Sequence, residues 1–141
     1  MLEHIGKKSE NVLFVIFRVI VGLSFALHGM QKFGWLSFAP LSIDKFAAMF
    51  GLPVWLAVIV ALVELIAGIA IALGIFGRLA ALIGGIDMIV ALIITHFPKG
   101  FWLMVNGGEL AILYLMVFFV IFALGSGKWA LGKVLFKKEL W

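Results

Sequence analysis

Four ionisable side chains stand in the long apolar stretches of this 141-residue chain, one in each stretch: Arg18, Glu64, Asp87 and Glu109. A charge at the centre of a bilayer costs at least about 2.5–3.5 kcal/mol on insertion scales, so each of them needs a role. Opposite charges can pair and hold helices together, and carboxyl groups can exchange protons. The set therefore predicts either ion pairing inside a helical bundle or a polar site within it.

Small residues recur at helical intervals around three of these charges. The predicted faces are Arg18, Gly22, Ala26 and Gly29; Ala57, Ala61, Glu64, Gly68 and Ala72; and Ala80, Gly84, Asp87, Ala91 and Thr95. Spacings of three and four place each set on one side of a helix. Small residues mark the places where membrane helices approach closely, so these three charges are predicted to face other helices and not lipid.

Depth along each stretch suggests which charges meet. A rise of about 1.5 Å per residue puts Arg18 about 10 Å and Asp87 about 12 Å from the cytoplasmic ends of their helices. The similar depths predict a structural ion pair between Arg18 and Asp87, although the two residues could equally belong to a site.

Glu64 is placed deeper, at about 18 Å, with no cation at its own level. A lone carboxyl group in that setting favours its protonated form. The sequence therefore predicts Glu64 as a catalytic proton carrier, with a helix–helix hydrogen bond as the structural alternative.

A second group of polar residues gathers near the predicted outer ends of the helices: His28, Gln31, Lys32, His96, Asn106 and Glu109. Donors and proton exchangers at the mouth of an apolar bundle suit the head group of an amphipathic molecule, with its tail among the helices. We predict that His28, Gln31, Lys32 and His96 bind the ligand and that Glu109 joins Glu64 in exchanging protons. We expect no covalently bound cofactor, and a quinone or another lipid is the candidate ligand.

A metal site is not predicted. His96 follows Asp87 by nine residues, which puts it half a turn out of phase with the small-residue face in a regular α-helix. No local H-x-x-x-H or E-x-x-H motif supplies a pair of ligands either. Hydrogen bonding near the membrane surface is the alternative role for His96.

The composition of the chain predicts that these residues lie within a membrane. The chain is 65% hydrophobic and 13% charged, with a mean hydropathy of +1.26, which is typical of an integral membrane protein. We predict one all-α membrane domain covering residues 1–141, a four-helix bundle with spans at 11–33, 54–76, 79–97 and 109–124. A short interfacial helix, Ile43–Phe50, capped by Ser42, is expected between the first two spans.

Basic residues predict the orientation. One side carries Lys7, Lys8, Arg78, Lys128, Lys133, Lys137 and Lys138, and the other carries Lys32, Lys45 and Lys99. The excess places both termini in the cytoplasm, in the plasma membrane. The positions of these residues account for the net charge of +4, so binding to nucleic acid is not needed to explain it. The segment from Lys128 to Trp141 mixes lysines with aromatic residues and suits an inner-surface anchor. The chain has no cysteine, which excludes thiol–disulfide chemistry by its own side chains.

Three segments resemble the DoxX family of small four-helix membrane proteins. They read RVIVGLSFALHGMQKFGW from Arg18, ELIAGIAIALGIFGRLAA from Glu64 and HFPKGFWLMVNGGELAILYL from His96. The family has the patterns R…GL.F..HG..K.FG, E…GG…LGL.TR.AA and H…GF….GG.E..LLYL. The matching residues are Arg18, His28, Lys32, Glu64, Arg78, His96 and Glu109. The resemblance implies kinship with the small subunit of a thiosulfate:quinone oxidoreductase, but it implies no catalytic assignment for these residues.

Together these features predict a membrane subunit associated with redox metabolism that binds a quinone-like or other amphipathic molecule in the bundle. Electrons from a sulfur substrate would have to come through a partner protein, because the chain has no thiol. Two alternatives stay open. One is a non-enzymatic assembly or scaffold subunit for a partner protein. The other is a small-solute transporter that acts as a homo-oligomer.

Overall fold

The computed structural model describes residues 2–137, with side chains from Ser9 onward. This part of the chain is helical and contains no strand, which confirms the predicted all-α class. The elements are α1 (Leu2–Lys32), α2 (Ile43–Phe50), α3 (Val54–Leu73), α4 (Gly77–Ala91), a π-helical turn η1 (Leu92–His96), a 3-10 turn η2 (Phe97–Lys99), α5 (Leu103–Asn106), α6 (Glu109–Leu124) and α7 (Leu131–Phe136).

Three segments of the described chain are long and apolar enough to cross a membrane: Ser9–Lys32, Val54–Leu73 and Gly77–Lys99. They match the first three predicted spans. The second ends earlier than predicted, because Gly74 adopts a left-handed conformation at φ 71° and closes the helix. The fourth apolar helix, α6, has 16 residues and is therefore about 24 Å long. That is shorter than a hydrocarbon core of about 30 Å, so its role as a span stays a prediction.

The small-residue faces of α1 and α3 pack directly on each other. A Cβ atom added to Gly22 would lie 2.5 Å from the backbone nitrogen of Ala72, and one added to Gly29 would lie 2.5 Å from the carbonyl oxygen of Ala61. The two backbones are thus in contact, as the sequence predicted. The contacts also fix the antiparallel register, with Gly22 near the end of α3 and Gly29 nearer its start.

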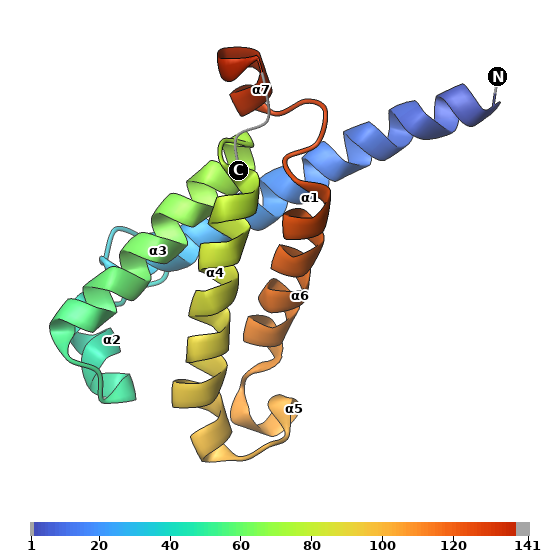
Figure 1. Ribbon diagram of the computed structural model, residues 1–141. Coiled ribbons are helices and arrows are strands. Elements are labelled where there is room, and N and C mark those ends of the chain that lie inside the picture. The colour runs from blue at the N-terminus through green and yellow to red at the C-terminus, as the bar shows by residue number, and fades with distance from the viewer. Residues whose placement is uncertain (1, 138–141) are drawn as a thin grey trace.

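In Figure 1 the α1 and α3 ribbons run obliquely to those of α4 and α6; α1 packs against α3, and α4 packs against both α3 and α6. Phe25 of α1 joins the pairs by packing against two rings of α6, with centroid distances of 5.2 Å to Tyr114 and 4.8 Å to Phe118. The α3–α4 turn and α7 lie at one end of the molecule, and α2 and α5 lie at the other. Polar residues near the α2 end are therefore separated from α7 by the length of the helical assembly.

The predicted helix between the first two spans is present as α2. The Ser42 side chain accepts a hydrogen bond from the backbone nitrogen of Lys45 at 3.3 Å, and Gly51 ends the helix at φ 63°. These are the cap and stop that the sequence predicted. The position of α2 at a membrane interface stays a prediction.

The segment after α6 folds back onto the α3–α4 turn. The backbone nitrogen of Gly132 donates to the carbonyl of Gly74 at 3.2 Å. Outward from this contact α7 exposes Val134, Leu135 and Phe136. Its use as an inner-surface anchor stays a prediction, and Lys138 and Trp141 lie outside the described residues.

Candidate ligand-binding site

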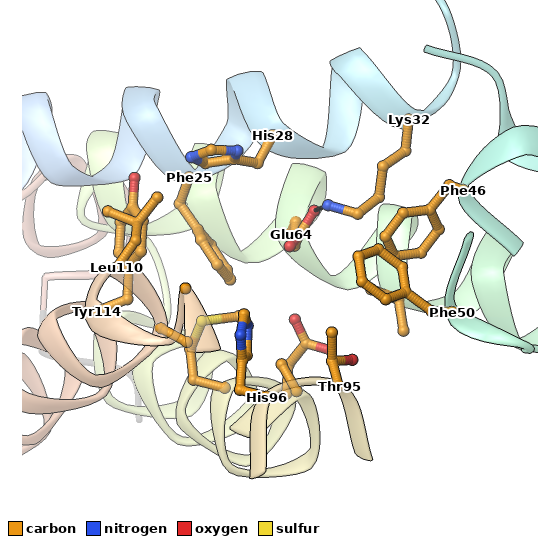
Figure 2. Close-up of a pocket in the computed structure, with 16 residues that line it drawn as sticks. Phe25, His28, Lys32, Phe46, Phe50, Glu64, Thr95, His96, Leu110 and Tyr114 are labelled. Atoms are coloured by element: carbon orange, nitrogen blue, oxygen red, sulfur yellow. Dashed lines mark hydrogen bonds and ion pairs between the residues drawn. The ribbon is translucent and has the colours of Figure 1, made fainter. Parts of the chain in front are cut away.

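A cavity of about 200 Å³ lies between the α1–α3 pair, α2, and the α4–α6 pair (Figure 2). Its wall is mostly apolar, with polar groups contributed by five separate elements: α1, α3, α4, η1 and α6. The polar residues on the wall are His28, Lys32, Glu64, Asp87, Thr95, His96 and Tyr114. A concave apolar site with a few converging polar groups is the usual form of a small-molecule site.

Lys32 and Glu64 form an ion pair on this wall, from Nζ to Oε2. Both residues are buried, at 8% and 5% exposed. The ammonium group also lies 4.7 Å from the centroid of the Phe46 ring, within cation–π range. The prediction that Glu64 has no cation at its level is therefore wrong.

The register between α1 and α3 explains this pairing. Gly29 packs against Ala61 and Leu65, so Lys32, which follows Gly29 by one helical turn, lies within about a turn of Glu64. The flexible lysine stem covers the remaining distance. Depth counted separately along each helix could not reveal this contact.

The predicted Arg18–Asp87 ion pair is also wrong. Arg18 is 2% exposed and uses its guanidinium group on backbone carbonyls. Nη1 donates to the oxygen of Ile71 at 3.0 Å, and Nη2 donates to the oxygen of Trp129 at 3.4 Å. Arg18 thus satisfies the carboxyl end of α3 and ties the segment before α7 to it.

The two charges lie at different depths. Arg18 lies against Gly74, in the turn between α3 and α4, whereas Asp87 lies about 15 Å along α4 from Gly77. Helix α1 begins at Leu2, well before the predicted span start at residue 11, so that start was a poor origin for measuring depth. Asp87 instead lines the cavity, where its Oδ2 is buried without a hydrogen-bond partner in the described part of the chain.

His96 reaches the same cavity because α4 ends in the π-helical turn Leu92–His96. A π-helical turn takes one residue more than an α-helical turn, which rotates the residues that follow it relative to those before. Asp87 and His96 therefore share a wall, and the prediction that they are out of phase is wrong. In Figure 2 the His96 ring rises from this side of the cavity toward Glu64.

The loop after η2 holds the His96 ring in place. Nδ1 of His96 lies 3.1 Å from the carbonyl oxygen of Asn106. The buried Asn106 side chain donates to the oxygen of Gly100 at 2.6 Å and accepts from the nitrogen of Gly108 at 2.7 Å. These bonds fix the carbonyl group that orients the histidine.

Two predicted site residues do not reach the cavity. Gln31 lies on α1 but is not on the cavity wall. Glu109 is exposed in the first turn of α6, where a carboxylate is favourable beside the helix dipole. His28 does line the cavity, and its ring packs against the edge of Tyr114 at 5.9 Å between centroids. Within the described part of the chain no three His, Asp or Glu side chains are grouped to hold a metal ion.

Sequence reasoning missed several residues of the wall. Phe46 and Phe50 come from α2, which was expected at the surface, and Tyr114 comes from α6, which showed no small-residue face. A weak signal for Tyr114 was available, since Ala111, Tyr114 and Phe118 recur at helical spacing and are all buried.

Comparison with known proteins identifies the family of the chain. The model of the DoxX family matches residues 13–97. An uncharacterized protein of Haemophilus influenzae is 35% identical over 135 residues, which cover 94% of this chain and 97% of that protein. A Bacillus subtilis protein named "Putative oxidoreductase CatD" is 28% identical over 130 residues, 92% of each chain. No solved structure matches the chain significantly. On this evidence the chain belongs to the DoxX family of membrane proteins.

Proposed function

We propose that the protein is a membrane subunit associated with redox metabolism that binds the head group of a quinone-like or other amphipathic molecule. The observation that carries the proposal is one cavity that joins the buried Lys32–Glu64 pair to Asp87 and two histidines within an apolar wall. The name of the Bacillus subtilis relative supports the redox association.

The volume of the cavity suits the head group of the ligand and not a whole lipid molecule. At about 200 Å³ it is smaller than the pockets of about 300–1,000 Å³ that hold drug-sized ligands. A single substituted ring would fill it beside Phe46 and Phe50 of α2. The apolar tail would then lie along the outer surfaces of the helices, which carry exposed leucine and isoleucine.

Each polar residue of the site would have a role that follows from its chemistry. Lys32 and His28 would bind the polar end of the ligand, and Glu64 would exchange a proton with it. Glu109 is exposed, so its proposed proton exchange would take place with the aqueous phase. Because the chain has no cysteine, any thiol-dependent electron transfer would take place in a partner protein.

The proposal includes the membrane arrangement. Helix α6 would be the fourth span, α2 would lie at the outer interface, and both termini would be cytoplasmic in the plasma membrane. The direction of α6, opposite to that of α4 and packed on it, supports this arrangement (Figure 1).

The experiment is to fill the cavity. Ala91 lies on the cavity wall, and Ala91→Phe would occupy space that a head group needs. Ile86→Phe, at an exposed position of the same helix, is the matched control. We expect mass spectrometry of the protein purified in nanodiscs to detect a bound quinone or other amphiphile in wild type and in the control, and not in Ala91→Phe. A wild-type protein that carries no amphiphile, or Ala91→Phe that keeps it, would contradict the proposal; a copurifying protein without any amphiphile would favour the scaffold alternative.

A further inference from the structure

We propose that the cavity selects a head group that donates hydrogen bonds, and thus the hydroxyl-bearing hydroquinone form over the carbonyl-bearing quinone form. Asp87 and His96 are the residues that make this selection. The inference rests on the proposed function above and adds to it the oxidation state of the ligand that is bound.

A hydrogen bond fixes the tautomer of His96. Its Nδ1 faces the carbonyl oxygen of Asn106 at 3.1 Å, and a carbonyl oxygen only accepts hydrogen bonds. Nδ1 must therefore carry the hydrogen, which leaves Nε2 of the neutral ring as an acceptor. Since Asn106 is itself held by two further hydrogen bonds, this assignment is built into the loop.

Asp87 is a second acceptor on the wall. It lines the cavity, yet its Oδ2 has no hydrogen-bond partner among the described residues. Neither Lys32 nor Arg18 bonds to it, because Lys32 is paired with Glu64 and Arg18, at another depth, binds carbonyl groups at the end of α3. A carboxyl group keeps acceptor capacity in both protonation states. A buried acceptor without a donor costs free energy, so a ligand hydroxyl at this position would be favourable.

The remaining polar groups do not reverse this bias. The Thr95 and Tyr114 hydroxyls donate or accept as the ligand requires, so they do not distinguish the two forms. Glu64 adds a further acceptor. Lys32 keeps two of its three N–H donors beside its bond to Glu64, and His28 can donate or accept. A hydroxyl oxygen accepts from such donors as a carbonyl oxygen does, so neither residue distinguishes the two forms. A quinone carbonyl opposite the ionised Asp87 carboxylate, or opposite Nε2 of neutral His96, would face another acceptor. Such unpaired polar groups give strong discrimination between otherwise similar ligands.

The test compares two probes that differ only in oxidation state, decylubiquinol and decylubiquinone. Their affinities for wild-type protein in nanodiscs are measured without oxygen at pH 8, by quenching of tryptophan fluorescence. We expect the quinol to bind at least about tenfold more tightly, the factor given by one net hydrogen bond of about 1.4 kcal/mol. Asp87→Asn, which replaces a carboxyl oxygen by an amide donor, should bring the affinity ratio toward one. Asp44→Asn, at an exposed carboxylate of α2, should keep the wild-type ratio.

Each result is decisive. Equal affinities in wild type, or tighter binding of the quinone, would overturn the selectivity and leave the proposed function standing. Failure of both probes to bind would remove the inference together with quinone binding itself. An unchanged ratio in Asp87→Asn would overturn the role of Asp87. Should that variant fail to fold, the monomethyl ether of the quinol gives the same test on wild type: it should bind more weakly than the quinol, and equal binding would overturn the inference.

Discussion

The Lys32–Glu64 pair places two opposite charges among apolar helices, where each is tolerated because of the other. Removal of one partner leaves a buried charge without compensation, which typically costs about 3–5 kcal/mol. We therefore expect Lys32→Met and Glu64→Met each to lower the free energy of unfolding by about that amount. The double variant should lose much less than the sum, because it buries no charge.

Unfolding in mixed detergent micelles would give the coupling free energy of this double-mutant cycle. Lys45→Met, which removes an exposed lysine of α2, is the control and should change stability by less than about 0.5 kcal/mol. Additive losses in the cycle would mean that the two side chains do not stabilise each other, and the pair would then have to be assigned to ligand binding alone.

For individual residues, the sequence predicted the buried polar positions more accurately than it predicted the contacts that those residues make. The small-residue faces correctly placed Glu64 and Arg18 at helix contacts, because close packing requires small side chains at regular spacing. Glu64 was predicted to have no cation at its level and Arg18 to pair with Asp87, and both predictions are wrong; the structure instead has the helix–helix hydrogen bond that was the alternative for Glu64. Each pairing depends on the register between two helices, and that register becomes visible only in the contacts of Gly22 and Gly29 with α3.

Among the elements, the π-helical turn Leu92–His96 decides what His96 can do. Deletion of Ile93 would allow this turn to become α-helical and would rotate His96 by about 100° relative to Asp87. We expect the deletion variant to keep the helical content of wild type in circular dichroism and to lose its binding of decylubiquinol by at least about tenfold, the effect of one lost hydrogen bond of about 1.4 kcal/mol.

The control is Ile93→Ala, which shortens an exposed side chain and keeps the number of residues in the turn. It should bind the probe as wild type does. A deletion variant with unchanged affinity would show that the phase of His96 is irrelevant to the site.

The sequence gives little sign of this π-helical turn, since one extra residue leaves the apolar character of the segment unchanged. The α2 helix, by contrast, was predictable from its Ser42 cap and Gly51 stop.

In the whole molecule, the two ends of the helical assembly differ in structure. The end with α7 is closed by backbone contacts, with Arg18 bound to Ile71 and Trp129, and Gly132 bound to Gly74. The other end carries the cavity, with α2 beside it and with Asn106 in contact with the His96 ring. A ligand from the membrane would therefore enter at the α2 end, while the α7 end keeps the helices together.

The number of spans decides how these ends lie in the membrane, and the lack of native cysteine makes it directly measurable. Lys45 in α2 and Lys128 after α6 are both exposed, so Lys45→Cys and Lys128→Cys should be accessible to a maleimide reagent that does not cross membranes. If α6 is a fourth span, Lys45→Cys should react in intact cells and Lys128→Cys only after permeabilisation. If α6 does not cross, both positions lie on the same side and react together, because only α3 and α4 then separate them. Reaction of Lys128→Cys alone in intact cells would keep four spans but reverse the orientation predicted from the lysine and arginine distribution.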